Sequence, residues 1–265
     1  MGDNSISNIG DAALYHLERF KRSLDALDGK PTWDLADTAD FDCMHYLGDV
    51  ALDEAAKALD LKPGQTVVDI GSGFGATGRY LNKHYGVHVT GIELQPEIHQ
   101  LAELITQRNG LSEQVRSVNA DFTTLNLDAP VDHIISFLCI LHIADRDTLF
   151  NKAASALKTG GKMYIEDYFA RTTLSKDVRD ALRNVASCPY LPSRDQYISD
   201  LTKAGFKDIQ FEDMTEEWAK FVHERAVSNR QRGTTAAPLT FFYDTIDALF
   251  AGGELGGARI MATKK

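Results

Sequence analysis

The chain has 265 residues, of which 43% are hydrophobic and 25% are charged, values typical of a globular protein with a sizeable core. Its net charge of −10 disfavours nucleic acid as a partner, because phosphates would be repelled in the absence of a basic face. No apolar run approaches the roughly 18 residues of a membrane span, and the polar start MGDNSISNIGD lacks the features of a secretory signal. We therefore expect neither nucleic acid nor a membrane among the partners.

Cysteine and histidine usage gives no sign of a metal site. Cys43, Cys139 and Cys188 are far apart in the sequence and lack the spacing of metal ligands. None of the histidines is paired with a carboxylate at a spacing typical of a metal centre. An odd number of cysteines without a secretion signal favours reduced thiols, so we expect a cytoplasmic protein without a bound metal. The sequence does not indicate an oligomeric state.

Residues 1–60 are predicted to form a helical N-terminal cap. They are polar overall, except for the aromatic-rich stretch PTWDLADTADFDCMHYLG at 31–48. Residues 61–265 then form the predicted main domain, with helical insertions within about 170–205 and 214–252. We expect the cap and the insertions to lie as a lid over the carboxyl edge of a sheet, where ligands of open α/β sheets bind. Helices that only cover the core are the alternative.

Seven short β-rich runs alternate with helical patterns in the main domain, which is the sequence sign of a parallel sheet covered by helices. Their nearly continuous apolar character fits strands buried on both faces. Between them, 96–110 and 146–161 carry apolar residues at helical intervals and end in glycine, a usual helix stop. The expected strands are 65–71, 87–94, 115–121, 131–138, 162–169, 207–213 and 257–264.

A glycine-rich turn follows the first expected strand, in VVDIGSGFGATGRYL at 67–81. Glycine is costly to order, so alternating glycines mark a tight turn or backbone that a ligand approaches closely. A strand, a glycine-rich turn and a helix N-terminus together form a nucleotide site. GSGFGA fits the dinucleotide pattern, a weak signal when alone, and Glu93 at the end of the next strand could hold ribose hydroxyls. The loop therefore predicts a nucleotide-like ligand, with a bare tight turn as the alternative.

Three features favour another nucleotide family over a nicotinamide cofactor. Asp69 lies two residues before the first glycine of the loop. Asp121, in NADF after the third expected strand, is placed to accept a hydrogen bond from an adenine amine. The last two expected strands, KDIQFED and GARIMATK, are expected to form an antiparallel pair. On these segments the chain resembles the class I S-adenosylmethionine-dependent methyltransferases.

The resemblance implies an α/β fold: a Rossmann-like, seven-stranded, mostly parallel sheet with an antiparallel last strand and helices on both faces. It also implies S-adenosylmethionine as the cofactor, with the glycine loop against its amino-acid end, where a Cβ would collide. Glu93 is then expected to bind the ribose, and Asp121 with Phe122 the adenine. The implied cofactor-binding residues are Asp69, Gly71, Ser72, Gly73, Gly75, Glu93, Leu94, Asp121 and Phe122.

His142, in SFLCILHIADRD after the fourth expected strand, is the candidate catalytic base. Methyl transfer from a sulfonium is an in-line displacement that needs an acceptor lone pair, so an amine acceptor must be unprotonated. A neutral histidine is a natural proton acceptor near pH 7. This one is expected at the carboxyl edge, across from the methyl donor. A histidine packed at a strand end is the alternative.

A narrower resemblance is to small-amine N-methyltransferases, namely the phosphoethanolamine and the sarcosine/dimethylglycine enzymes. It rests on DHIISFLCILHI, GKMYIEDYFA, RDQYISDLTKAGFKDIQFEDMTEEW and the terminal GARIMATKK. In the phosphoethanolamine enzymes a histidine after strand four forms a catalytic dyad with an N-terminal tyrosine, which implies His142 together with Tyr15 or Tyr46. Those enzymes carry an Arg-Asp pair where Phe137 and Leu138 stand here. A leucine cannot pair with an ammonium, which favours a less polar or differently oriented acceptor over phosphoethanolamine.

Further residues are expected to line the acceptor site. Aromatic side chains stabilise a methylated, cationic nitrogen by cation–π attraction, and an arginine can receive a carboxylate or phosphate of the acceptor. Core packing of the aromatics and a solvated position of the arginine are the alternatives. The expected substrate-binding residues are Leu138, Tyr168, His45, Trp33 and Arg171.

The function predicted from the sequence is S-adenosylmethionine-dependent methyl transfer to a small molecule. The favoured acceptor is an amine nitrogen of the glycine, sarcosine, dimethylglycine or phosphobase type. Methylation of carbon, oxygen or sulfur in a more apolar small molecule is the first alternative, because Leu138, Cys139 and Ile140 would form an apolar wall. A non-catalytic, cofactor-binding regulatory subunit is the second.

Overall fold

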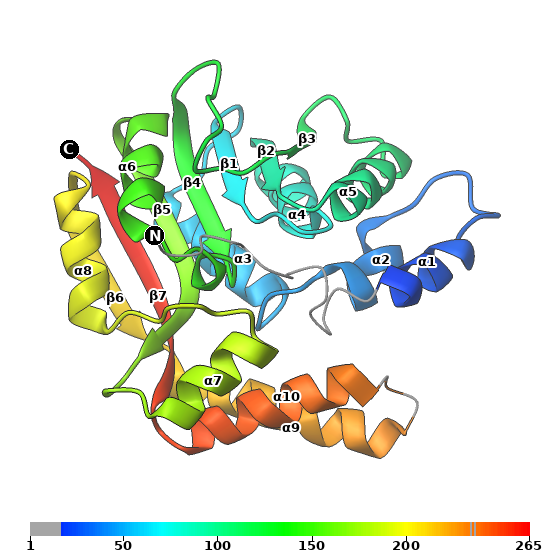
Figure 1. Ribbon diagram of the computed structural model, residues 1–265. Helices are drawn as coiled ribbons and strands as arrows, with labels where there is room; N and C mark the ends of the chain where they lie inside the picture. The colour runs from blue at the N-terminus through cyan, green and yellow to red at the C-terminus, as the bar shows by residue number, and fades with distance from the viewer. Residues whose placement is uncertain (1–16, 234, 236) are drawn as a thin grey trace.

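A seven-stranded sheet runs through the centre of the molecule (Figure 1). Its strands are β1 (Thr66–Ile70), β2 (His88–Glu93), β3 (Val115–Asn119), β4 (Val131–Phe137), β5 (Leu157–Ala170), β6 (Phe206–Asp213) and β7 (Leu255–Lys264). Their order across the sheet is β3-β2-β1-β4-β5-β7-β6. β7 is antiparallel to both of its neighbours, and the other pairs are parallel. The predicted mostly parallel sheet with an antiparallel last strand is therefore confirmed.

Helices connect the strands, in a computed structural model that describes residues 17–233, 235 and 237–265. Ser175, Ser193 and Asp145 each accept a hydrogen bond from a backbone N–H of the helical turn that follows, which is the role of an N-cap. The helices are α1 (Leu17–Asp25), α2 (Leu35–Asp42), α3 (Asp49–Leu59), α4 (Ala76–Tyr85), α5 (Pro96–Arg108), the 3-10 turn η3 (Ile140–His142), α6 (Arg146–Ala156), α7 (Lys176–Val185), α8 (Arg194–Lys203), α9 (Thr215–Arg232) and α10 (Ala237–Ala251).

One predicted helix ends earlier than its glycine stop indicates. The sequence places a helix at 146–161, but α6 ends at Ala156 and Leu157 already belongs to β5. Leu157 pairs with Val131 of β4, so sheet pairing begins before the glycines are reached. The local sequence marked the turn, and the pairing of the two strands decided where the helix stops.

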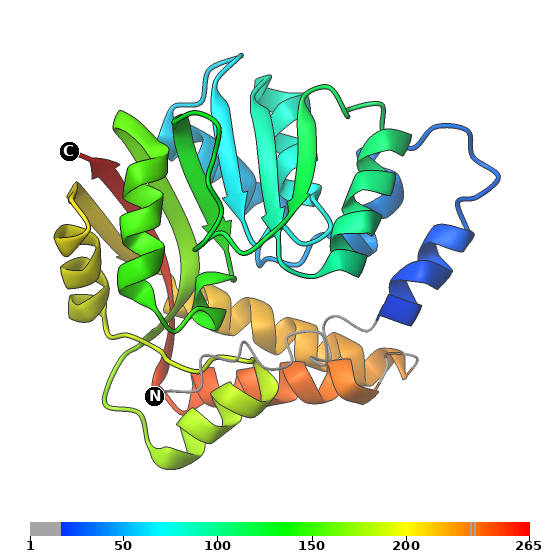
Figure 2. The same cartoon turned by 45° about the horizontal axis from the view of Figure 1, so that its top comes forward.

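The two faces of the sheet are covered by different helices. Val68 of β1 packs with residues of α6 and α8, whereas its neighbour Val67 packs with residues of α3 and α4. Figure 2 shows α6 in front of the sheet and α3 and α4 behind it. Successive side chains of a strand point to opposite faces, so a strand that is covered on both sides is apolar at consecutive positions. The predicted helices on both faces are confirmed.

Three of the remaining helices lie along the carboxyl ends of the parallel strands. Figure 1 shows α7, α9 and α10 below the ends of β1 and β4, where the sequence places a lid. Together with Tyr46 of the cap they form an apolar core of their own, which includes Trp218 of α9 and Phe242 of α10. α8 packs instead against β6, and α3 against β5, so these two helices cover the sheet. The division into a cap at 1–60 and a main domain at 61–265 stays a prediction.

The part of the chain that the structure describes contains no helix long and apolar enough to cross a membrane. Within the same residues, no cluster of histidine, cysteine, aspartate or glutamate side chains could hold a metal ion. Cys43, Cys139 and Cys188 are free thiols.

Candidate active site

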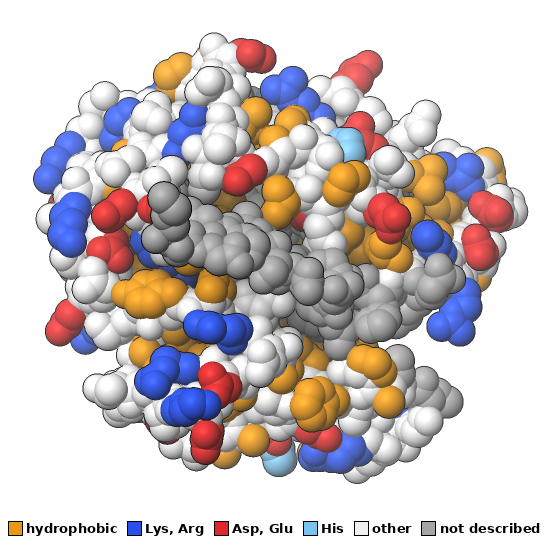
Figure 3. All heavy atoms as spheres, in the orientation of Figure 1, with side chains coloured by type: hydrophobic (Ala, Val, Ile, Leu, Met, Phe, Trp, Pro, Cys, Tyr) orange, Lys and Arg blue, Asp and Glu red, His pale blue; other side chains and the backbone are white. Residues whose placement is uncertain are grey.

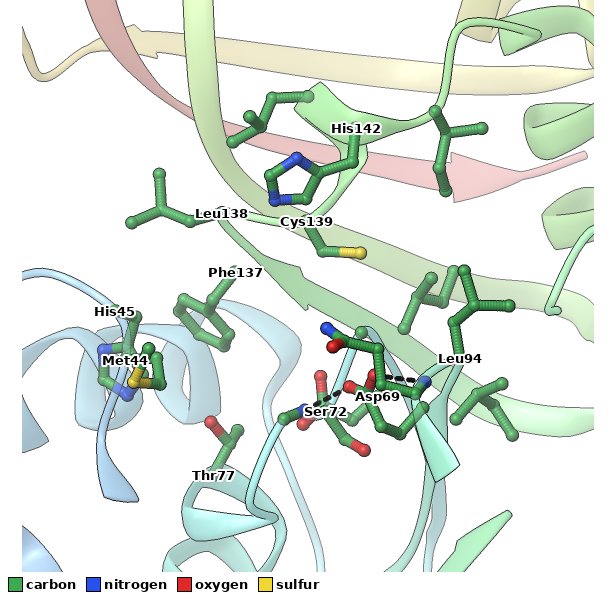
Figure 4. A pocket seen from close by; sticks show the side chains of 18 of the residues that line it. Met44, His45, Asp69, Ser72, Thr77, Leu94, Phe137, Leu138, Cys139 and His142 are labelled. Atoms are coloured by element: carbon green, nitrogen blue, oxygen red, sulfur yellow. Dashed lines mark hydrogen bonds between the residues drawn. The ribbon is translucent and has the colours of Figure 1, made fainter. Parts of the chain in front are cut away.

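A large pocket opens at the carboxyl ends of the parallel strands. It comprises about 1350 Å³ of space, part of it open to solvent. Figure 4 shows Asp69, Ser72 and Leu94 on one side of it, and Leu138 and His142 on the other. The first side is where the sequence places the cofactor, and the second is where it places the acceptor.

The residues that line the pocket fall into two groups, the cofactor half and the acceptor half. The cofactor half consists of strand ends and the loops directly after them: Asp69, Gly71, Ser72, Gly73, Glu93, Leu94, Asp121 and Phe122. The acceptor half consists of side chains from the cap, the end of β4 with η3, β5 and α10: Met44, His45, Tyr46, Phe137, Leu138, Leu141, His142, Tyr168, Phe242 and Tyr243.

The three glycines of the loop after β1 all have positive φ, a conformation that other residues rarely adopt. A Cβ on Gly71 would lie 2.1 Å from the sulfur of Cys139, and one on Gly75 would lie 2.8 Å from Nη1 of Arg79. A Cβ on Gly73 would meet no atom within 4 Å, and this residue lines the pocket. Packing within the protein therefore explains Gly71 and Gly75, and only Gly73 leaves room for a ligand. Gly75, predicted as a cofactor contact, is the N-cap residue of α4.

Glu93 ties the glycine loop to the end of β2. Its Oε2 accepts a hydrogen bond from the backbone N–H of Gly73 at 3.0 Å, and its Oε1 accepts one from that of Gln95 at 2.8 Å. The side chain is buried, which raises the pKa of its carboxyl. Each carboxylate oxygen has more than one lone pair, so both can accept a further hydrogen bond from ligand hydroxyls.

Asp69 and Asp121 stand on either side of Glu93 along the sheet. Asp69 is 2% exposed, and burial together with the charge of Glu93 raises its pKa to about 7. A cation bound near these two carboxylates would relieve their repulsion. Asp121 Oδ1 accepts hydrogen bonds from the backbone N–H and the hydroxyl of Thr123 at 2.8 and 2.7 Å, which holds the carboxylate at the pocket wall.

The other predicted residues of the cofactor half differ in what they offer a ligand. Leu94 is 39% exposed and presents apolar surface to the pocket, whereas Phe122 is 4% exposed and packs in the core beneath α6. The hydroxyl of Ser72 is turned toward β2, because a Cβ on Gly91 would lie 2.5 Å from its Oγ. Leu94 is therefore the best placed of the three to contact a flat ring.

A buried ion pair joins the cap to the glycine loop. Asp42 Oδ2 accepts hydrogen bonds from Nη2 of Arg79 at 2.7 Å and from the hydroxyl of Thr38 at 2.6 Å. Arg79 also donates to the carbonyl of Phe74 at 2.6 Å and to the hydroxyl of Thr106 at 3.2 Å. The side chains of Arg79 and Asp42 are 0% and 4% exposed. Since Phe74 belongs to the loop and Asp42 lines the pocket, the pair fixes the cap against the cofactor half.

His142 lies in the turn after β4, and one side of its ring is fixed. Asp167 Oδ2 accepts a hydrogen bond from the backbone N–H of Leu141 at 2.7 Å, which anchors the turn. His142 Nδ1 lies 3.0 Å from the carbonyl oxygen of Ser187, so this nitrogen carries the proton and donates it. Burial lowers the pKa of His142 to about 4. The imidazole is therefore neutral at pH 7, with the lone pair of Nε2 available in the acceptor half.

Aromatic rings from distant segments meet in the acceptor half. The hydroxyls of Tyr46, from the cap, and Tyr168, from β5, are hydrogen-bonded to each other, and burial raises the pKa of both. Trp218 packs edge-on behind Tyr46, with ring centroids 5.1 Å apart. The rings of His45 and Phe137 have centroids 4.9 Å apart, and burial lowers the pKa of His45. The structure thus brings His45, Tyr46, Tyr168 and the His142 turn into one pocket, as the sequence predicts.

Several residues of the acceptor half were missed from the sequence: Met44, Phe137, Leu141, Phe242 and Tyr243. Met44 adjoins His45, and Leu141 adjoins His142, so the neighbourhood of predicted residues was a usable signal. Phe242 and Tyr243 gave no such signal, because their place depends on how α10 packs against the rest of the molecule.

Trp33 lies away from the pocket. Its indole N–H donates to the carbonyl of Leu27 at 3.2 Å, and its ring packs in a small core with Phe20 and Ile98. The predicted contact of Trp33 with the acceptor does not fit this position, because its aromatic surface is already buried against α1 and α5. Tyr15, the other candidate tyrosine, falls outside the described residues.

Arg171 also lies elsewhere, in a second groove along α7. Arg171, Arg179 and Arg183 line this groove together with Leu182, and Figure 3 shows basic side chains gathered over α7. Arg171 is exposed, and its backbone N–H donates to the carbonyl of Glu254 at 2.9 Å. The predicted contact of Arg171 with an acceptor bound near His142 does not fit, since Arg171 lines this groove and not the pocket that contains His142.

Comparison with known proteins places the chain in a family. The family model described as mycolic acid cyclopropane synthetase matches residues 44–237. The chain is 32% identical over 201 residues to a phosphoethanolamine N-methyltransferase of Triticum aestivum, and this match covers 75% of this chain and 39% of that protein. It is 29% identical over 162 residues to a glycine/sarcosine/dimethylglycine N-methyltransferase of Actinopolyspora halophila, and this match covers 61% of this chain and 29% of that protein. The chain thus spans less than half the length of these relatives.

A solved structure shows the same fold. The chain is similar to Haemonchus contortus phosphoethanolamine N-methyltransferase 2 in complex with S-adenosyl-L-methionine, with a TM-score of 0.77 and 22% identity. The match covers 98% of this chain and 60% of that one. The resemblance to class I S-adenosylmethionine-dependent methyltransferases, stated from the sequence, is therefore confirmed. The chain belongs to the mycolic acid cyclopropane synthetase family of methyltransferases.

Proposed function

We propose that this chain transfers a methyl group from S-adenosylmethionine to the nitrogen of a small amine. The observation that carries the proposal is the pairing, in one pocket, of a carboxylate-lined glycine loop with the neutral imidazole of His142. The curated relatives named above, which methylate amines according to their names, support the choice of nitrogen. S-adenosylmethionine supplies an electrophilic methyl group on a sulfonium. The residues of this chain bind the cofactor and the acceptor, orient them and exclude water from the pocket.

The cofactor half offers a partner for each polar part of such a nucleoside. We assign the ribose hydroxyls to Glu93, whose two oxygens are held by backbone N–H groups 3.0 and 2.8 Å away. The adenine amine is assigned to Asp121, and the adenine ring to Leu94 and Phe122. Gly73, with open space where a Cβ would lie, admits the amino-acid end. Asp69 places negative charge near the sulfonium and the amino group.

His142 then acts on the acceptor through Nε2. Because Nδ1 donates to the carbonyl of Ser187, the lone pair of Nε2 accepts a hydrogen bond from the N–H of a primary or secondary amine and turns the amine lone pair toward the methyl group. A pKa of about 4 keeps the imidazole of His142 neutral. His142 therefore orients the acceptor and relays the proton that the methylated amine loses to water. Of the two candidate tyrosines, Tyr46 lines the same pocket as His142, and its hydroxyl is hydrogen-bonded to that of Tyr168.

The test is a binding and turnover assay on the purified chain. Calorimetric titration should show binding of S-adenosylmethionine and S-adenosylhomocysteine, and mixing with S-adenosylmethionine and a panel of primary, secondary and tertiary amines should release S-adenosylhomocysteine. Binding without any product across the panel would contradict amine methylation and favour a cofactor-binding regulatory subunit.

A second candidate is methylation of carbon, oxygen or sulfur in a more apolar molecule. Leu138 and Cys139 line the pocket and make its wall apolar, as the sequence indicates, whereas Ile140 is 0% exposed and points into the core beneath α6. The name of the family, a cyclopropane synthetase, is consistent with carbon as an acceptor. Adding phenols, thioethers and alkenes to the same panel distinguishes this candidate from the first. The cytoplasmic location predicted from the cysteines stays a prediction.

A further inference from the structure

Among the side chains that the structure describes, the charged ones that line the pocket are carboxylates. Asp42, Asp69, Glu93 and Asp121 line it, and among the described residues no lysine or arginine does. Asp42 is paired with the buried Arg79, and the other three carboxylates belong to the cofactor half. The described lining therefore offers an anionic acceptor no positively charged side chain.

The two histidines of the acceptor half supply no positive charge either. Burial lowers the pKa of both His45 and His142, in the second case to about 4. The Nδ1 atoms of the two rings lie 3.1 Å and 3.0 Å from the carbonyl oxygens of Tyr46 and Ser187, contacts that a neutral ring with a proton on Nδ1 satisfies. Both imidazoles are therefore neutral near pH 7 and offer an anion no countercharge.

The basic residues that could bind an anion stand in the groove on the other side of α7. Arg171, Arg179 and Arg183 line that groove together with Leu182, while Ala186, at the end of the same helix, lines the pocket. These three arginines line the groove and not the pocket, so they do not face the carboxylate or phosphate of an amine bound beside His142.

The remaining surface of the acceptor half suits an uncharged molecule that becomes cationic on the reacting nitrogen. Met44, Phe137, Leu138 and Phe242 provide apolar contacts, and the rings of the lining aromatics attract a methylated, positively charged nitrogen. A buried anion without a partner is strongly disfavoured, whereas a cation or a neutral group is not opposed by the charges present.

We propose that the methyl acceptor is an amine that carries no carboxylate, phosphate or other anionic group, and whose remainder is hydrocarbon or hydroxyl-bearing. This inference rests on the proposed function and narrows it to a substrate class. It separates this chain from relatives whose names contain phosphoethanolamine, glycine or sarcosine, acceptors that each carry an anion next to the amine.

Matched pairs of acceptors test it directly. The pairs are ethanolamine against phosphoethanolamine, N-methylethanolamine against sarcosine, and dimethylaminoethanol against dimethylglycine, each at saturating S-adenosylmethionine. The member of each pair that lacks the anionic group should have a kcat/KM at least about tenfold higher, since its partner must bury a carboxylate or phosphate without a countercharge. Preference for the anionic members overturns this inference and leaves the proposed function standing. Binding of S-adenosylhomocysteine without methylation of any amine overturns both.

A charge introduced into the acceptor half sharpens the result. Leu138→Arg should raise the kcat/KM ratio of sarcosine to N-methylethanolamine by about tenfold relative to Leu138→Gln, which matches it in polarity but not in charge. An unchanged affinity for S-adenosylhomocysteine shows that both variants are folded. If the two variants bind that ligand and have equal ratios, charge is not what excludes the anion, and the inference is wrong.

Discussion

The cofactor half and the acceptor half of the pocket are built in opposite ways. The residues of the cofactor half lie at the ends of strands of the parallel sheet or in the loops after them, and hydrogen bonds such as that from Gly73 to Glu93 hold the loops in place. The acceptor half collects side chains from segments as far apart as Met44 and Tyr243. Packing of the cap and insertion helices, rather than strand register, therefore decides what the acceptor meets. Such an arrangement allows the acceptor half to change by substitution while the nucleoside site stays the same.

The largest expected effect is on turnover and is confined to the acceptor half. His142→Ala should lower kcat by roughly 10²–10⁴, the usual contribution of a positioned acid–base group. The affinity for S-adenosylhomocysteine should stay within a factor of about two, because the hydrogen bond of the His142 ring goes to Ser187, outside the cofactor half. Steady-state kinetics and calorimetry measure the two quantities. Full activity in this variant would show that His142 has no role in the chemistry.

The second prediction concerns the buried ion pair between Arg79 and Asp42, which joins the cap to the glycine loop of the cofactor half. Arg79→Leu leaves the Asp42 carboxylate buried without its partner, so the free energy of unfolding should fall by about 3–5 kcal/mol. Chemical denaturation measures the change.

The control for this prediction is an exposed pair on the same part of the cap. Lys30 and Asp37 lie 2.5 Å apart, with the Lys30 side chain 45% exposed. Lys30→Ala should therefore cost less than about 1 kcal/mol. Equal losses in Arg79→Leu and Lys30→Ala would mean that the buried pair does not hold the cap against the loop.

The pH dependence of cofactor binding reports on Asp69. Its raised pKa of about 7 means that the carboxyl takes up a proton as the pH falls through 7, so the charge that attracts a sulfonium is lost on the acid side. The affinity for S-adenosylmethionine should fall by up to about tenfold per pH unit below 7. Asp69→Asn should bind weakly at every pH and lose this dependence. Parallel pH profiles for the two proteins would assign the titration to another group.

The smallest expected effect concerns the hydrogen bond between Tyr46 and Tyr168, which links the cap to β5. Tyr168→Phe leaves the buried hydroxyl of Tyr46 without this partner and should lower the free energy of unfolding by about 1 kcal/mol. The double variant Tyr46→Phe/Tyr168→Phe should lose less than the sum of the two single losses, because it leaves no unpaired hydroxyl. Additive losses in thermal or chemical denaturation would argue that the two hydroxyls act independently.

Where a strand end defines the position, the sequence indicated which residues share a pocket, and their roles in binding stay predictions. Glu93 and Asp121 each follow a β-rich run, and parallel strands end at a common edge, so both could be assigned to one site. Pattern reading failed for Trp33 and Arg171, whose residue types suited an acceptor site but whose helices and loops pack elsewhere. It was also incomplete for the glycines, because the atoms that exclude a Cβ at Gly71 belong to a residue far along the chain.

The sequence by itself determined the seven strands, the glycine loop and the carboxylates of the cofactor half, because alternation of apolar runs and backbone constraints act over a few neighbouring residues. Only the tertiary structure decided which aromatic rings surround the acceptor and which arginines do not. Those positions depend on how helices that are distant in the sequence pack their apolar faces against one another. The type of a residue does not indicate which distant residue it will contact.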